Sequence, residues 1–182
     1  MNLRDEILKE HSKRQTVKIG RWVGNDPKRF KQLMELFLHG EYRVTQRSAW
    51  IVSYCGDAHP NLLKPWLAEM MKRMQQPSVH VAVKRNVLRF FSQVDIPKDL
   101  AGWMISMCFD ELNSPASPIA VKVHAMTILA NIAEKEREIT RELVPMLDRM
   151  YPYAGAGIRA RIRKTKKQLE SKKLIPKRES LL

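Results

Sequence analysis

One apolar pattern that returns at nearly regular spacing limits the fold of this chain more than any other feature. Apolar residues stand at i, i+3, i+4, i+7 and i+8 from Phe30, and the pattern starts again at Leu63, Leu100 and Ile139. Only Glu142, in the last copy, breaks it. Residues with this spacing share one face of an α-helix. The starts are 33, 37 and 39 residues apart, and an amphipathic helix that repeats at this period predicts an α-solenoid.

A second amphipathic segment follows each copy, as a two-helix repeat requires. These segments are 43–55, 78–93, 118–133 and 156–169. When the first three are aligned on a basic residue, apolar residues fall three positions before it and four and seven positions after it. The fourth segment has Thr165 and Gln168 at the later positions, so we expect it to be an end cap. The basic residues of this column are Arg47, Lys84, Lys122 and Arg161.

Prolines mark where several of the helices begin. Asp26 before Pro27 predicts a helix N-cap followed by proline in the first turn, and Pro60 and Pro97 have the same role in later helices. Pro145 falls inside the fourth copy of the pattern. Its position predicts either a kink or a helix that starts later.

A length of 182 residues suits one domain with a sizeable core. We expect this domain to span residues 1–170, with an N-terminal cap in 1–24 and the repeats in 26–170. Within the cap, the apolar residues of segment 3–14 share one face and predict a capping helix. Residues 171–182 are charged and interrupted by proline, and we expect a basic tail that frays.

The clearest copy of the repeat is NLLKPWLAEMMKRMQQPSVHVAVKRNVLRFF, residues 61–91. Its apolar places, and the basic residue early in its second helix, resemble those of HEAT-like (armadillo-type) helical repeats. The chain looks like one of the short bacterial HEAT-like repeat proteins, and the resemblance covers residues 26–170. It implies an all-α superhelix of about four two-helix repeats, with the first helices outside and the second helices lining a concave face.

The net charge of +14 is concentrated at the two ends of the chain. Residues 32–155 are almost neutral, with 14 basic and 13 acidic residues, whereas residues 1–31 have nine basic and four acidic ones. Residues 156–178 contain ten basic residues and Glu170 as their one acidic residue. This asymmetry points to an acidic partner, either an acidic protein or the phosphate backbone of a nucleic acid.

The basic column gives a candidate binding surface if the second helices line a groove. Lysine and arginine at this spacing can neutralise successive phosphates, and binding of that kind depends strongly on salt. Two plainer interpretations stay open: the column ties adjacent repeats together, or the C-terminal cluster is only a solvated face. The candidate binding residues are Arg43, Arg47, Lys84, Arg85, Arg89, Lys122, Arg159, Arg161, Arg163, Lys164, Lys166 and Lys167.

No motif for catalysis or cofactor binding is present in the sequence. GxGxxG, Walker, HExxH and GxSxG motifs are all missing, and the five histidines are dispersed over different segments. We therefore expect no cofactor, no metal site and no small-molecule substrate. The sequence is interpreted as a non-enzymatic binding or scaffold module.

The strongest local candidate for a catalytic site is Cys55, Asp57 and His59, beside Trp50 and Trp66. This trio lies between two predicted repeats, where Asp57 or His59 is better suited to cap a helix than to catalyse. DNA-alkylation-repeat glycosylases, which also use HEAT-like repeats, are the alternative class. Their resemblance implies a carboxylate with an aromatic side chain, and only Asp57 with Trp50 fits those roles. Trp66 is predicted to lie in the core, at the second apolar place of its helix.

The cysteines and the N-terminus indicate the cellular compartment. Cys55 and Cys108 both lie in apolar helical patterns, which predicts reduced core residues. The first residues, MNLRDEILKEHSKR, lack the apolar stretch of a signal peptide, and nowhere do 18 apolar residues follow one another. We therefore expect a cytoplasmic protein that does not enter a membrane.

Overall fold

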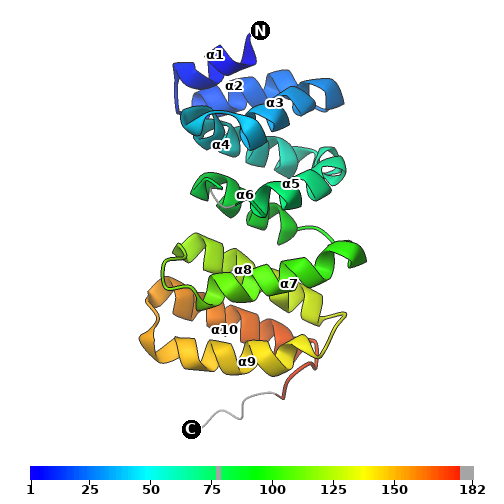
Figure 1. Ribbon diagram of the computed structural model, residues 1–182, viewed down its shortest axis with the longest axis vertical. Coiled ribbons are helices and arrows are strands. Elements are labelled where there is room, and N and C mark those ends of the chain that lie inside the picture. The colour runs from blue at the N-terminus through cyan, green and yellow to red at the C-terminus, as the bar shows by residue number, and fades with distance from the viewer. Residues whose placement is uncertain (77–78, 177–182) are drawn as a thin grey trace. The chain divides into compact units, whose positions relative to one another are not determined.

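The computed structural model describes residues 1–76 and 79–176, and its elements are helices (Figure 1). Within these two ranges it has ten α-helices, three 3-10 helices and no β-strand, so the all-α prediction is confirmed. The α-helices are α1 (Leu3–Lys9), α2 (Lys13–Val23), α3 (Pro27–His39), α4 (Tyr42–Ala58), α5 (Leu67–Met74), α6 (Val81–Phe91), α7 (Lys98–Asn113), α8 (Ile119–Ala133), α9 (Ile139–Met150) and α10 (Ala156–Ser171).

The chain divides into two compact units, Met1–Phe90 and Phe91–Leu182. In the first unit α4 packs against α1, α2 and α3, and in the second α8 packs against α7, α9 and α10. Each unit is thus built around a second helix of the predicted repeat. All four predicted second helices are present, as α4, α6, α8 and α10, although position 78 lies outside the described residues. The expected solenoid of two-helix repeats is confirmed.

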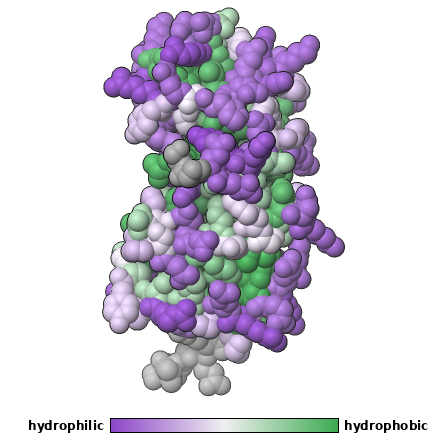
Figure 2. All heavy atoms as spheres, viewed as in Figure 1, coloured by the Kyte–Doolittle hydropathy of each residue, from purple (hydrophilic) through white to green (hydrophobic). Residues whose placement is uncertain are grey.

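The apolar stripes of the helices form the core of each unit. On α3, the five stripe residues are at most 1% exposed: Phe30, Leu33, Met34, Phe37 and Leu38. Helix α8 is different, because its buried residues surround most of its axis, as expected for a helix covered by three neighbours. Hydrophilic side chains cover most of the face shown in Figure 2, with apolar atoms visible between them.

The second copy of the apolar pattern does not form one continuous helix. The chain winds through two 3-10 helices, η1 (Pro60–Leu62) and η2 (Lys64–Trp66), and α5 begins only at Leu67. Pro65 explains this difference, because proline has no N–H to donate and its ring crowds the preceding turn. Trp66 therefore lies ahead of α5 and is half-buried, so its predicted place in the core is wrong.

Pro145 does not delay the start of its helix. Helix α9 begins at Ile139 and continues through Pro145 to Met150. Both Pro145 and Glu142 are exposed, so the proline ring and the acidic side chain lie on the solvent side. The carbonyl of Arg141, which loses its helical donor to Pro145, can accept a hydrogen bond from water there. The helix therefore tolerates both departures from the apolar pattern.

The N-terminal segment 3–14 forms parts of two helices, not the single capping helix that its apolar residues predict. Ser12 interrupts it as the N-cap of α2, where its Oγ accepts a hydrogen bond from the Gln15 N–H at 3.1 Å. The Gln15 side chain donates in turn to the Glu6 carbonyl at 2.7 Å, which ties α2 to α1. A serine followed by glutamine three residues later is a helix-start signal. The N-terminus thus has the same two-helix organisation as the repeats.

Helix α3 begins as the sequence predicts. Asp26 is its N-cap, and the Asp26 Oδ1 accepts hydrogen bonds from the N–H groups of Lys28 and Arg29 at 2.8 and 3.2 Å. Pro27 occupies the first turn. Pro97, by contrast, is the residue just before α7 and not part of its first turn.

The substitution Asp26→Ala should lower the free energy of unfolding by about 1 kcal/mol, because two amides of α3 lose their acceptor. Urea unfolding followed by circular dichroism measures the change. Gln32→Ala, on the exposed side of the same helix, is the matched control and should stay within about 0.5 kcal/mol of wild type. An equal loss in both variants would contradict the role of Asp26 as a cap.

Candidate functional site

Two residues of the basic column bond to the backbone of a neighbouring helix. The Arg47 Nη1 on α4 donates to the Leu8 carbonyl at 2.6 Å, and the Lys122 Nζ on α8 donates to the Leu112 carbonyl at 3.3 Å. Leu8 and Leu112 lie in the last turns of α1 and α7, where carbonyl groups have no partner within their own helix. Arg47 and Lys122 are half-buried. Their bonds favour the interpretation in which the column ties helices together.

The other two members of the column are also half-buried. The Arg161 Nη1 on α10 donates to the Thr127 Oγ1 on α8 at 3.2 Å. Lys84 on α6 also has a polar or electrostatic interaction within the protein. The structure thus places these two side chains within the packed repeats, and neither is a free cation on a groove wall.

Near the column, Arg89 differs from Arg43 and Arg85. The Arg89 Nη2 lies 2.8 and 2.7 Å from the two carboxylate oxygens of Asp57, so Arg89 joins α6 to α4. Arg43 and Arg85 are exposed. Burial, together with the positive charge of Arg85, lowers the pKa of His80. Of these three arginines, Arg43 and Arg85 remain available to a partner.

Helix α10 buries one stripe of residues and exposes most of its basic ones. Ile158, Ile162, Thr165 and Leu169 are buried, so Thr165 fills a core position although it breaks the apolar pattern. Gln168 donates to the Asn131 Oδ1 on α8 at 3.0 Å. The two residues that weakened the fourth repeat in the sequence therefore both contribute to its packing.

Five basic side chains outside the buried stripe form what we call the α10 basic face, and only Lys166 among them is half-buried. Lys166 pairs with the Asp148 carboxylate, Arg163 donates to the Tyr151 hydroxyl at 3.1 Å, and Arg159 donates to the Pro152 carbonyl at 2.9 Å. Lys164 and Lys167 are exposed, as are Arg159 and Arg163. The α10 basic face comprises Arg159, Arg163, Lys164, Lys166 and Lys167.

The start of the predicted basic tail is hydrogen-bonded to the second unit. The Lys172 and Leu174 N–H groups donate to the carbonyls of Gln168 and Leu169, and the Arg137 Nη2 donates to the Lys173 carbonyl at 2.5 Å. Residues 177–182 lie outside the described residues. The bonded stretch adds Lys172 and Lys173 to the basic end of α10.

The Cys55, Asp57 and His59 trio lacks a reactive thiol. Cys55 is buried, and this burial raises its pKa to about 12. The Asp57 carboxylate is paired with Arg89, and His59 is the C-cap residue of α4. Neither Asp57 nor His59 acts as the side-chain cap that the sequence suggests. A protonated thiol and a paired carboxylate give this trio a structural role.

Trp50 and Asp57, the pair considered for a glycosylase, lie on the same helix, α4. They are seven residues apart and so share a face, separated by roughly 10 Å along the axis. Trp50 is exposed, and its ring packs against the His11 ring in a T-shaped arrangement with 5.7 Å between the centroids. The bidentate contact with Arg89 occupies the Asp57 carboxylate.

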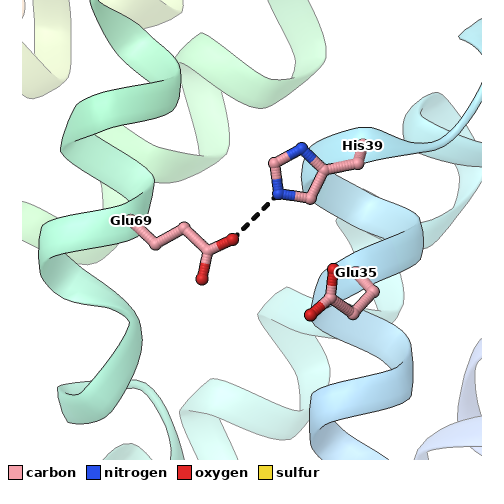
Figure 3. Close-up of side chains that lie close together, drawn as sticks. All are labelled: Glu35, His39 and Glu69. Carbon is pink, nitrogen blue, oxygen red and sulfur yellow. Dashed lines mark hydrogen bonds and ion pairs between the residues drawn. The ribbon is translucent and has the colours of Figure 1, made fainter.

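Three side chains that the sequence analysis did not connect come together in the first unit. Glu35 and His39 on α3 meet Glu69 on α5, and one ligand atom from each lies within 4.8 Å of the others (Figure 3). The His39 Nε2 lies 2.8 Å from the Glu69 Oε1. The sequence prediction considered only the spacing between histidines, so it did not include this cluster. The spacing of Glu35 and His39, one helical turn apart, is the signal that could have found half of it.

A surface pocket of about 400 Å³ adjoins this cluster. Glu35 and Glu69 line it together with apolar side chains that include Phe30 and Trp66. Trp66 thus lines a pocket and is not a core residue. The pocket therefore combines two carboxylates with an apolar wall.

Packed pairs of amphipathic helices that recur at a nearly regular period define a helical-repeat protein, a class whose stacked units present extended surfaces for binding. A family model described as a HEAT repeat domain matches residues 3–169. The chain therefore belongs to the HEAT repeat family, and α1 and α2 lie within the match. Membership of this family indicates a scaffold or binding module. Neither the curated proteins nor the solved structures gave a match.

Among the described residues, no helix combines the length and the apolar character that a membrane span needs.

Replacing Arg47 with methionine should lower the free energy of unfolding by roughly 1.5–3 kcal/mol, because a charged hydrogen bond to a helix-end carbonyl is lost. Arg43→Met, one helical turn away on the exposed side of α4, is the matched control and should cost less than about 0.5 kcal/mol. Chemical unfolding of both variants gives the comparison. Similar stabilities for the two would show that the bond to Leu8 is not structural.

Neither cysteine should react with a thiol-specific disulfide reagent at pH 8 while the protein is folded. Burial raises the pKa of both thiols, that of Cys55 to about 12, and the nearby Glu111 carboxylate raises that of Cys108 further. The nucleophilic thiolate therefore forms only at much higher pH. Both thiols should react after denaturation. Rapid labelling of the native protein would contradict this expectation.

Proposed function

We propose that this chain is a non-enzymatic binding module that uses the α10 basic face to bind an acidic partner. The supporting observation is the state of Arg163, Lys164 and Lys167. All three are exposed, and none of them forms an ion pair with a carboxylate within the part of the chain that the structure describes. Positive charge that packing does not use is available to an outside anion.

The geometry of the face suits an anion that repeats. Arg163 and Lys167 are one helical turn apart, which is roughly 6 Å along the axis, and Lys164 lies beside them. The arginine fork can bind a phosphate or carboxylate through two parallel hydrogen bonds, and lysine binds either as a point charge. A row of such side chains recognises charge density and not sequence.

Two classes of partner are candidates, and a different observation supports each. The ten basic residues between 156 and 178 favour the phosphate backbone of a nucleic acid, because charge neutralisation supplies most of non-specific binding. Membership of the HEAT repeat family favours a protein as the partner. A cytoplasmic location, where both kinds of partner occur and thiols stay reduced, is part of the proposal.

The basic column makes a smaller contribution in this proposal. Arg47, Lys122 and Arg161 already bond to neighbouring helices, and Arg89 is paired with Asp57. A partner would have to displace those bonds. Within the first unit, the exposed Arg43 and Arg85 are the candidates for additional contacts.

The combined substitution of Arg163, Lys164 and Lys167 by glutamate tests the proposal. Affinity for an arbitrary DNA duplex should fall at least about tenfold at low salt, and the dependence of log K on log salt should flatten by about one unit per lost phosphate contact. Fluorescence anisotropy over a series of salt concentrations measures both quantities. Circular dichroism shows whether the helices remain, since these side chains are exposed.

The matched control changes the same number of charges elsewhere. Lys13, Lys28 and Lys98 are exposed and lie in the first turns of α2, α3 and α7, where glutamate is favourable. Their combined replacement by glutamate should leave most of the binding intact. Equal losses in the two triple variants would show that net charge, and not the α10 basic face, governs binding. If wild type binds no duplex at low salt but binds an acidic polypeptide through the same residues, the partner is a protein.

A further inference from the structure

We propose that Glu35, His39 and Glu69 form a binding site for a divalent transition metal ion, best suited to Zn²⁺, that joins α3 to α5. One imidazole and two carboxylates is a ligand set that Zn²⁺ accepts. Their ligand atoms lie within 4.8 Å of one another. Ligand atoms around a tetrahedral zinc are roughly 3.4 Å apart, as bonds of about 2.0–2.2 Å require. The three side chains therefore need only a small contraction to enclose an ion.

The backbone around the site holds the ligands in place. Glu35 and His39 are four residues apart on α3, so their side chains share one helix face, and the opposite face is anchored by buried residues such as Phe37. Glu69 follows the buried Leu67 on α5. Figure 3 shows the Glu69 side chain extending from α5 toward His39, with the Glu35 carboxylate on the same side of α3.

A second contact fixes α5 against the end of α3. The Arg73 Nε donates to the Leu38 carbonyl at 2.8 Å, one residue before His39. This bond sets the distance between the helix that carries Glu69 and the helix that carries the other two ligands. The three side chains are thus held near one another without a metal.

The local electrostatics favour a cation. Two carboxylates face the imidazole, and His39 is the last residue of α3, at the negative end of the helix dipole. Two cationic side chains oppose this: Lys31 lines the adjoining pocket, and Arg73 lies near the end of α3. Arg73 is engaged with the Leu38 carbonyl and with Gln76, which reduces its effect on the site.

The ligand types also discriminate between metals. Mg²⁺ and Ca²⁺ prefer an all-oxygen environment, whereas an imidazole nitrogen suits Zn²⁺, Co²⁺ and Ni²⁺. Three protein ligands leave a fourth position for water or an outside group. Glu35 and Glu69 also line the pocket of about 400 Å³, so space for that fourth ligand adjoins the site. The pocket volume is within the range that small-molecule sites have.

The site differs in place and chemistry from the α10 basic face. It lies in the first unit and attracts cations, and it does not depend on the proposed function. A bound ion would stabilise the folded state by mass action, because the unfolded chain cannot bring the three ligands together.

Isothermal titration of the full chain, freed of metal by a chelator, tests the proposal with ZnCl₂ as the probe. Wild type should bind one equivalent, and His39→Ala and Glu69→Gln should each weaken this binding at least about tenfold. MgCl₂ should give no saturable binding below about 1 mM. His59→Asn is the matched control: it removes a histidine at the C-terminal end of α4, where asparagine is tolerated, and should bind zinc like wild type.

Titration with Co²⁺ gives a spectroscopic readout that does not depend on stability. Visible absorption bands of four-coordinate Co²⁺ should appear with wild type and with His59→Asn, and should be missing with His39→Ala. Folding of each variant is checked by circular dichroism. Zinc binding that is unchanged in His39→Ala, equal binding of Mg²⁺, or no saturable zinc binding below about 1 mM would each overturn the proposal.

Discussion

The interaction on which both units depend is the hydrogen bond from a basic side chain to the open carbonyl end of a neighbouring helix. Every α-helix ends with carbonyl groups that have no donor within the helix, and burying them unbonded is costly. Here Arg47 donates to a carbonyl at the end of α1, Arg73 to one at the end of α3, and Lys122 to one at the end of α7. These bonds fix how far each helix slides along the next. The apolar stripes can then meet in register.

This use of charge explains why the positive residues of the chain are not equivalent. A side chain that is half-buried against a carbonyl, like Arg47, is part of the architecture, whereas an exposed one like Lys167 is not. Net charge alone cannot separate the two kinds. The structure is needed to separate architectural from free basic side chains. The acceptors are backbone carbonyl groups, and the amino-acid sequence does not show which of them lie at helix ends. Arg163, Lys164 and Lys167 of the α10 basic face are exposed charges that form no ion pair with a carboxylate within the described residues.

Much of the fold could be predicted from the sequence because the apolar residues of a packed helix must recur with its turn. That rule predicted the second helices, and the Asp26-Pro27 pair predicted the N-cap of α3. It failed where local backbone chemistry overrode burial: Pro65 forced 3-10 turns, and Ser12 divided the N-terminal segment. For Pro145, the later helix start that was one of its two expected effects is absent, because its exposed position makes the loss of one backbone hydrogen bond tolerable. The proposed metal ligands could not be predicted because Glu69 comes from a different repeat. Its closeness to Glu35 and His39 depends on how α5 lies against α3.

The exposed side of α10 has a consequence for the assembly of such proteins. A stack of helix pairs has no intrinsic reason to stop, since each pair offers the next one a surface to cover. Helix α8 is buried on several sides by its neighbours, whereas α10 is buried along one side and exposes lysine and arginine elsewhere. Two copies that met through this side of α10 would bring like charges together. The same residues that can attract a polyanion thus disfavour self-association through this side of α10.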